Sequence, residues 1–153
     1  MTRHGAPLVR AFLDQDSETF SSVVYDRPGG QAVVIDPVLD FDYKSGRTRT
    51  DTAQQLVDFV REQGLTLHWI LETHAHADHL SAAPFIREQL GGRIAIGEHI
   101  REVQGIFRRV FNLERAFLPD GSQFDQLFAD GDTFEVGELR FRVMHTPGHT
   151  PAD

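Results

Sequence analysis

The sequence contains no cysteine among its 153 residues, and this absence narrows its chemistry at once. A chain without thiols forms no disulfide, offers no thiolate to a metal and has no cysteine nucleophile. Histidine and the carboxylates are then the only strong metal-binding side chains. Because the chain has eight histidines, their spacing becomes the main question.

Basic residues and long apolar runs are also scarce. The 15 lysine and arginine residues stand against 23 aspartate and glutamate residues, and the formal charge is -8. An acidic surface repels phosphate backbones, so we expect no nucleic-acid partner. Apolar runs such as residues 32–35 are too short to span a bilayer, and residues 1–7 lack the apolar core of a signal peptide. We therefore expect a cytoplasmic protein without a membrane partner.

What remains is the composition of a folded globular domain. Hydrophobic residues make up 40% of the chain and charged residues 25%, close to the averages for soluble proteins. The length suits one domain or part of one. Since no repeat, low-complexity tract or linker is found, residues 1–153 are interpreted as a single unit.

Local patterns predict alternating strands and helices. An opening antiparallel sheet is expected from residues 8–13, 19–25 and 32–35, and residues 41–49 read as a loop. A helix capped by Thr50 or Asp51 and ended by Gly64 is expected next, followed by a strand at 65–71 and a helix at 81–90. A strand at 93–96, a helix at 98–110 and a hairpin of residues 133–136 and 139–144 complete the expected elements. Strict alternation would place Thr66, His68 and Ile70 on one face of their strand. Residues 111–130 are irregular and are interpreted as a surface insertion or lid.

The strand at 65–71 leads directly into the run Thr73-His74-Ala75-His76-Ala77-Asp78-His79. In extended backbone, side chains two apart share a face, so His74 and His76 can converge on one ion while Asp78 and His79 begin the next helix. A loop at the end of a strand is a usual place for a site. The run therefore predicts a metal centre.

A second element, Thr146-Pro147-Gly148-His149, follows the last predicted strand. Proline fixes the backbone and glycine permits close approach, so His149 is the predicted distant ligand, whereas His145 is assigned to the strand end or to the surroundings of the ligands. Asp36 either orients a ligating imidazole or serves the turn that follows it. The alternative for all these residues is a solvated, metal-free loop, but the two motifs together favour the metal centre.

The residues His74, His76, Asp78 and His79 resemble the His-x-His-x-Asp-His motif of the metallo-β-lactamase superfamily. The segments around Asp36 and His149 are similar to those of its glyoxalase II and persulfide dioxygenase branch. The resemblance spans nearly the whole chain. It implies an α/β fold, a four-layer αβ/βα sandwich, of which this chain supplies mainly the first αβ half. We therefore expect residues 1–153 to be the N-terminal, apparently truncated part of a metallo-β-lactamase-like domain.

The same resemblance implies a reaction. The run from Glu72 to Ala83 looks most like that of bacterial persulfide dioxygenases, in which one Fe(II) is held by two histidines, here His74 and His149, and by a later aspartate that has no counterpart here. His76, Asp78 and His79 would then act around these ligands. The implied reaction oxidises a thiol persulfide, such as glutathione persulfide, with O₂ to sulfite and thiol. Zinc and manganese suit the same donor atoms.

Two alternatives stay open. In a glyoxalase II-like thioester hydrolase, His74, His76 and His149 would hold one metal, Asp78 and His79 would hold its neighbour, and a metal-bound hydroxide would be the nucleophile. An inactive half-domain would instead expose apolar surface and a sheet edge, and would associate with another chain, a homo-oligomer included.

Overall fold

A mixed six-stranded sheet forms the centre of the computed structural model, which describes residues 6–76 and 79–153. Its strands, in spatial order, are β1 (Leu8–Leu13), β2 (Phe20–Tyr25), β3 (Gln31–Ile35), β6 (Thr66–Leu71), β8 (Arg93–Gly97) and β9 (Gln126–Phe128). The first three strands pair antiparallel, as expected, and the pairs from β3 to β9 are parallel.

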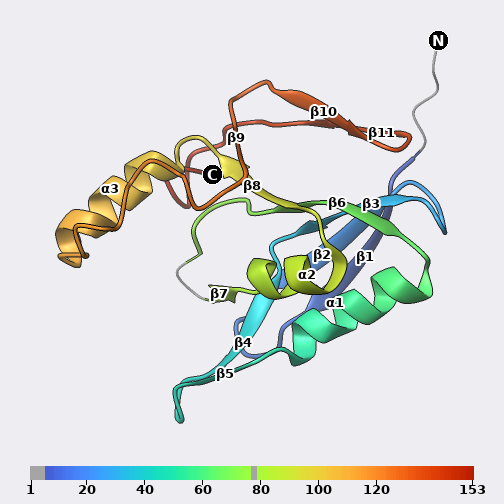
Figure 1. Ribbon diagram of the computed structural model, residues 1–153, viewed down its shortest axis with the longest axis horizontal. Coiled ribbons are helices and arrows are strands. Elements are labelled where there is room, and N and C mark those ends of the chain that lie inside the picture. The colour runs from blue at the N-terminus through green and yellow to red at the C-terminus, as the bar shows by residue number, and fades with distance from the viewer. Residues whose placement is uncertain (1–5, 77–78) are drawn as a thin grey trace.

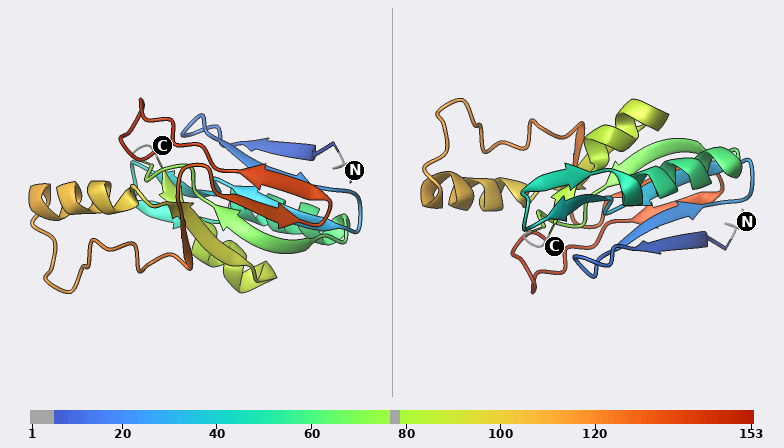
Figure 2. Two further views of the ribbon diagram at one scale, coloured as in Figure 1. Left: turned by 90° about the horizontal axis from the view of Figure 1, so that it is seen from above. Right: turned by 90° about the horizontal axis from the view of Figure 1, so that it is seen from below.

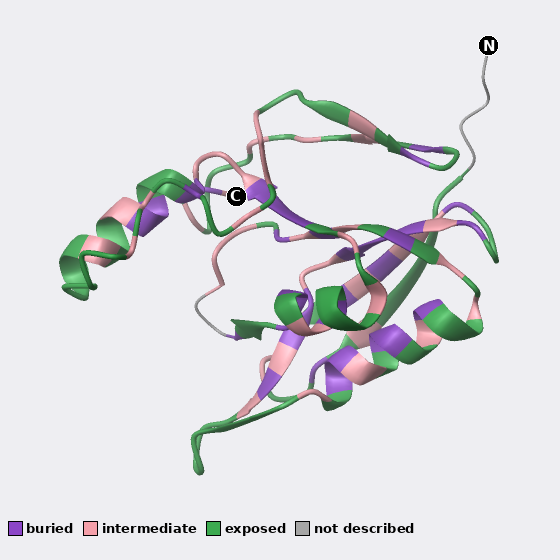
Figure 3. Cartoon of the chain, in the orientation of Figure 1, coloured by how far each residue is buried: buried purple, intermediate pink, exposed green. Residues whose placement is uncertain are grey.

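The two faces of this sheet are covered differently. Helices α1 (Asp51–Glu62) and α2 (Ala83–Leu90) lie on one face, and the hairpin of β10 (Thr133–Val136) and β11 (Leu139–Arg142) lies over the other (Figure 1, Figure 2). Helix α3 (Ile100–Val110) projects away from this body, and its outer end is largely exposed (Figure 3). The hairpin and the three helices confirm the expected order of elements.

The loop expected at residues 41–49 is wrong. Strand β4 (Val38–Asp42) pairs antiparallel with β5 (Arg47–Arg49), and its other edge pairs with β7 (Leu80–Ser81). Because Leu80 and Ser81 are engaged in this pairing, α2 begins at Ala83, two residues later than predicted. Residues 43–46 form the turn between β4 and β5, whereas β4 and β7 pair across more than 40 residues of sequence, which local composition does not reveal.

The N-terminal cap of α1 also differs from the expectation. Neither Thr50 nor Asp51 is found to cap the helix with its side chain. Asp40, from β4, accepts hydrogen bonds from the backbone N–H of Thr52 at 3.0 Å and from the Thr52 hydroxyl at 2.5 Å. A buried carboxylate from a neighbouring strand thus takes over the role of a local cap.

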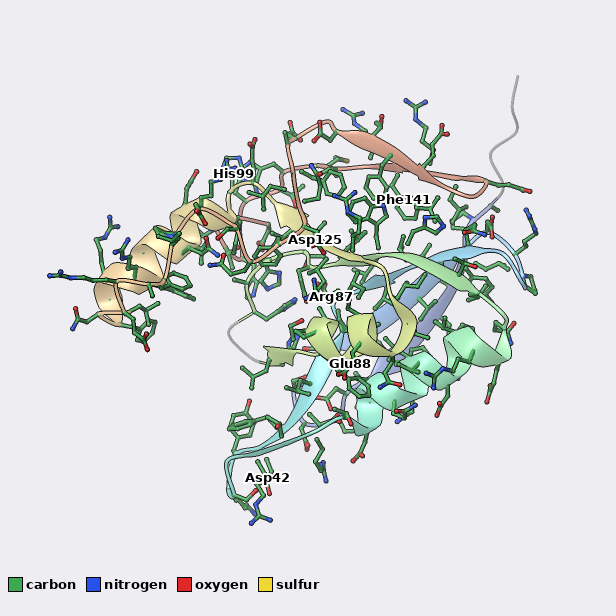
Figure 4. All side chains as sticks on the ribbon, viewed as in Figure 1. Asp42, Arg87, Glu88, His99, Asp125 and Phe141 are labelled. Carbon is green, nitrogen blue, oxygen red and sulfur yellow. The ribbon has the colours of Figure 1, made fainter. Side chains whose placement is uncertain are left out.

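The segment from 111 to 130 is less irregular than expected, because β9 lies within it and adds to the sheet beside β8. Asp125, just before β9, accepts a hydrogen bond from the backbone N–H of Ile94 at 2.8 Å and one from Arg87 of α2 at 3.3 Å (Figure 4). The role of residues 111–130 as a lid stays a prediction.

Strict alternation along β6 is also wrong. The pairing of β3 with β6 shifts register between Ala32 and Val33, which are paired with Leu67 and Trp69, so His68 is an extra residue. As a result Leu67 and Ile70 both enter the core on the helix-covered face, where they join Leu56, Val57 and Val60 of α1 and Ile86 of α2. A bulge of this kind changes which face each later side chain occupies.

Aromatic rings fill much of the space between the sheet and the hairpin. Trp69 lies 5.4 Å from Phe128 and 5.9 Å from Phe134 between ring centroids, and Phe134 stacks on Phe141 at 5.0 Å. Beyond the hairpin, Val9, Leu13 and Phe20 are exposed on the edge strand and its neighbour. Such apolar surface was expected of a half-sandwich.

Among the described helices, none has the length and apolar character needed to cross a bilayer.

Candidate metal centre

The candidate site lies where the parallel strands end. Asp36 follows β3 directly, residues 72–76 follow β6, and the loop of residues 145–153 comes in from β11. Parallel strands bring their carboxyl ends to one edge of a sheet, and ligands of open α/β sheets bind at that edge. The topology therefore gathers the two sequence motifs although more than 70 residues separate them in the chain.

Four imidazole rings lie in a row at this edge. The centroid of His74 is 4.9 Å from that of His149 and 3.9 Å from that of His76, and His76 lies 4.0 Å from His79. The structure thus brings together His74, His76, His79 and His149, as the sequence predicts. Asp78 lies outside the described residues, and its role stays a prediction.

The hydrogen bonds around Thr73 determine which nitrogen of His74 carries the proton. The Thr73 hydroxyl donates its only hydrogen to Asp36 at 2.8 Å, so it can only accept from Nδ1 of His74, which lies 2.9 Å away. With the proton on Nδ1, the lone pair of the neutral ring is on Nε2. That atom is buried and has no hydrogen-bond partner among the described residues.

Burial also favours the neutral form of this ring. Loss of solvent lowers the pKa of His74, and the neighbouring His76 lowers that pKa further. A metal ligand must be a neutral imidazole with an available lone pair. The buried Nε2 of His74 meets both requirements, so these residues fit a metal ion.

Asp36 connects the strand end to both histidines of the run. Its carboxylate accepts hydrogen bonds from the backbone N–H of Thr73 at 2.7 Å and from Nε2 of His76 at 3.1 Å. Although burial raises the pKa of Asp36, these hydrogen bonds lower it overall. In a neutral His76 this contact leaves the lone pair on Nδ1. Of the two roles considered for Asp36, the geometry favours orientation of the imidazole.

Glu72 is a buried carboxyl that sequence reasoning did not single out. Its side chain is 6% exposed, accepts a hydrogen bond from the Ser81 hydroxyl and places Oε2 3.8 Å from Nε2 of His76. Burial raises the pKa of Glu72 to about 7, and the charge of Asp36 adds to the rise. Together with Asp36 and His76 it forms a second group of donor atoms, all within 4.8 Å of one another. The only signal in the sequence was its place directly before the histidine run.

Asp153 is the other residue that the sequence did not indicate. It accepts hydrogen bonds from the backbone N–H and the hydroxyl of Thr150, at 2.7 and 2.8 Å, and places Oδ1 3.4 Å from Nδ1 of His74. These hydrogen bonds, despite burial, lower the pKa of Asp153. Asp153 therefore connects the loop that carries His149 to the ring of His74.

The other described histidines, His68, His99 and His145, lie apart from this row. His145 stacks on His99 with centroids 3.9 Å apart, and its Nε2 donates to the Pro151 carbonyl at 3.0 Å. His68 is on β6, where its Nε2 contacts Gln31. His4 lies outside the described residues. The expectation that His145 belongs to the strand end is compatible with this placement.

Two cavities approach His74 from different sides. The larger, about 620 Å³, lies between the sheet and the hairpin and includes His149, His99 and Phe141 in its wall (Figure 4). The smaller, about 350 Å³, includes His76 and His79. Both cavities share His74 and Glu72 in their walls, so the two spaces meet at the candidate centre.

The hydroxyl of Thr73 offers a direct test of the tautomer. The substitution Thr73→Val keeps the side-chain shape but removes the hydroxyl. Because residues that orient metal ligands typically contribute roughly 10–100-fold to metal affinity, we expect Thr73→Val to lower the affinity for the metal ion by about tenfold. Thr73→Ser keeps the hydroxyl and should bind metal as the wild type does. Competition with a fluorescent chelator measures both variants. Equal affinity in Thr73→Val would contradict the assigned hydrogen bonds.

The fold and the histidine row together define a class, the metal-binding α/β proteins with a site at the carboxyl ends of parallel strands. Within this class, the chain belongs to the metallo-beta-lactamase superfamily, because the sequence pattern that defines this superfamily matches residues 17–153. This membership confirms the expected fold class and implies that the protein binds metal.

Known proteins support the same relationship. The chain is 53% identical to a probable metallo-hydrolase of Burkholderia pseudomallei over 94% of its own length and 49% of that protein. It is 32% identical to the mitochondrial persulfide dioxygenase ETHE1 of Bos taurus over 98% of its own length and 48% of that protein. It is 41% identical to a Dictyostelium discoideum protein named glyoxylase B2, over 94% of its own length and 50% of that protein.

A solved structure shows the same arrangement. The crystal structure of ETHE1 from Myxococcus xanthus matches with a TM-score of 0.66 and 28% identity, over 95% of this chain and 51% of that one. The chain therefore spans about half the length of these relatives. The similar proteins include hydrolases by name as well as a dioxygenase, so the relationship establishes the superfamily and leaves the reaction to be proposed.

Proposed function

We propose that the protein is a non-haem iron persulfide dioxygenase, of which this chain is the N-terminal part. The observation that carries the proposal is the buried Nε2 of His74, which has a lone pair and lies between the rings of His149 and His76. The similarity to the persulfide dioxygenase ETHE1 supports the choice of reaction. One persulfide, one O₂ and one water would give one thiol, one sulfite and two protons, as the terminal sulfur is oxidised and O₂ is reduced.

His74 and His149 would hold the metal. Bound Fe(II) would supply the redox centre at which the persulfide is oxidised by O₂. Asp36 and Thr73 keep the rings of His76 and His74 in the required tautomers. His79, which is buried beside His76, and Asp78 would hold or move protons around the reacting oxygen atoms. Asp153 orients His74 and holds the loop of His149.

The larger cavity would take the thiol persulfide. It begins at His74 and His149, and its wall combines apolar rings with the charged side chain of Arg142. An arginine is the side chain best suited to a carboxylate, and glutathione persulfide carries two. The cavity therefore suits an anionic thiol compound whose sulfur reaches the histidines.

A second candidate is a glyoxalase II-like thioester hydrolase. The row of imidazoles continues from His76 to His79, which would give a second metal position when Asp78 is added. The relatives at 53% and 41% identity carry hydrolase and glyoxylase names. This candidate uses both ligands of the first, His74 and His149, and adds His76, Asp78 and His79, so the reaction and the number of bound metal ions distinguish the two candidates.

The deciding experiment follows O₂ with an electrode while the complete, iron-loaded protein is given glutathione persulfide. We expect O₂ consumption with about one sulfite formed per O₂, and no hydrolysis of a glutathione thioester by the same preparation. Hydrolysis without O₂ consumption would overturn the proposal in favour of the hydrolase. Protein loaded with zinc serves as a control, because zinc has no redox chemistry and should not consume O₂.

A further inference from the structure

The function described so far assigns no substrate to the smaller cavity. Its wall is formed by Leu80 of β7, Ala83 and Pro84 at the start of α2, Ile94 and Ile96 of β8, and Phe124 before β9. Helix α2 and strand β7 lie close to β8, on the side of the six-stranded sheet away from the hairpin of β10 and β11 (Figure 1). One end of this cavity reaches the imidazoles of His76 and His79.

The chemistry of this wall fits a small apolar molecule. Among the described residues that line it, none is a lysine or arginine, and Glu72 is the one acidic residue. A glutathione-type persulfide carries carboxylates and would find no cation here, whereas Arg142 lines the larger cavity. Away from the histidines, Ser81 and Gln123 are the polar residues of the wall and the rest of it is apolar. Apolar cavities are known to accept xenon and other apolar guests.

We propose that the smaller cavity is the O₂ site of the enzyme, through which O₂ approaches the histidine row from the side opposite to the persulfide. This inference rests on the proposed dioxygenase function and assigns its two substrates to different spaces. The wall residues common to both cavities, His74, Glu72 and Ile96, mark the place where the two substrates would meet. Separate routes allow both to occupy the site at once, because neither has to pass the other.

Leu80 offers a way to close this cavity without disturbing the core. Its side chain lines the cavity and the residue is 50% exposed, so Leu80→Trp adds bulk at the entrance where solvent can accommodate the rest of the ring. Leu118, which is 51% exposed and does not line either cavity, provides the matched control Leu118→Trp.

The kinetic test measures initial rates of the complete, iron-loaded protein at varied O₂ and at varied glutathione persulfide. A loss of binding raises KM for the substrate concerned, so Leu80→Trp should raise KM for O₂ by about fivefold and leave KM for the persulfide unchanged. Leu118→Trp should match the wild type in both. If Leu80→Trp leaves KM for O₂ unchanged, or raises KM for the persulfide instead, the inference fails while the dioxygenase function stands. A wild type that consumes no O₂ would overturn both.

A structural test does not depend on turnover. Crystals of the complete protein pressurised with xenon should show a xenon atom beside Ile94, Ile96 and Phe124, and the same treatment of Leu80→Trp should show none there. Xenon absent from this cavity in the wild type would overturn the assignment.

Discussion

The substitution His74→Ala should abolish tight metal binding and O₂ consumption in the complete protein. The Nε2 atom of His74 is buried without a hydrogen-bond partner among the described residues, and its ring lies between those of His149 and His76. Residues that merely orient metal ligands contribute roughly 10–100-fold to affinity, so loss of a ligand should cost at least about 100-fold. Metal content after dialysis and chelator competition measure the effect.

The matched control for this experiment is His68→Ala. His68 lies six residues earlier on β6 and contacts Gln31, away from the imidazole row. This variant should keep the metal content and activity of the wild type. His74→Ala protein that retains wild-type affinity would contradict the assignment of His74 as a ligand.

Ile70→Ala should be the most damaging change to stability among the core positions of β6. Ile70 is 0% exposed, lies in the central strand and packs among residues of α1 and α2. Truncation of a buried isoleucine removes apolar contacts and leaves a cavity, which typically lowers the free energy of unfolding by about 2–5 kcal/mol. Urea denaturation followed by circular dichroism measures the difference between variant and wild type.

Ile106→Ala makes the same chemical change at a surface position. Ile106 is 40% exposed on α3, the helix that projects from the body. Its truncation should change the free energy of unfolding by less than about 1 kcal/mol. Equal effects at Ile70 and Ile106 would show that the packing of α1 and α2 against the sheet contributes little to stability.

Much of the histidine row could be predicted from the sequence because the information is local. His74 and His76 are two residues apart just after a strand, a spacing that favours one face for both rings, and His149 follows a Pro-Gly pair in the loop after β11. Their gathering is confirmed by the ring distances. Their role as ligands stays a prediction.

The contributions of Glu72 and Asp153 could not be predicted in the same way. Glu72 is buried through its contact with Ser81, which is held in place by the pairing of β7 with β4. Asp153 reaches His74 because a loop more than 70 residues away in sequence folds back onto it. Both environments depend on contacts between distant segments, and residue type alone carries no information about such contacts.

The errors in the predicted fold have the same origin. Polar residues around Gly46 read as a loop, yet Asp40 of β4 accepts two hydrogen bonds from Thr52 at the start of α1, and this contact connects β4 to the helix. The bulge at His68 arises from the register between β3 and β6, a relation between two strands. The pattern of apolar residues within one segment predicts the structure of that segment, but not its pairing with other segments.

The hydrogen bonds of Thr73 also bear on how this site could be rebuilt elsewhere. A single hydroxyl, held by Asp36, sets the proton position of His74. A designer who grafts the histidines onto another scaffold would need to carry the threonine and the aspartate with them, because without that pair the imidazole could turn its N–H toward the ion.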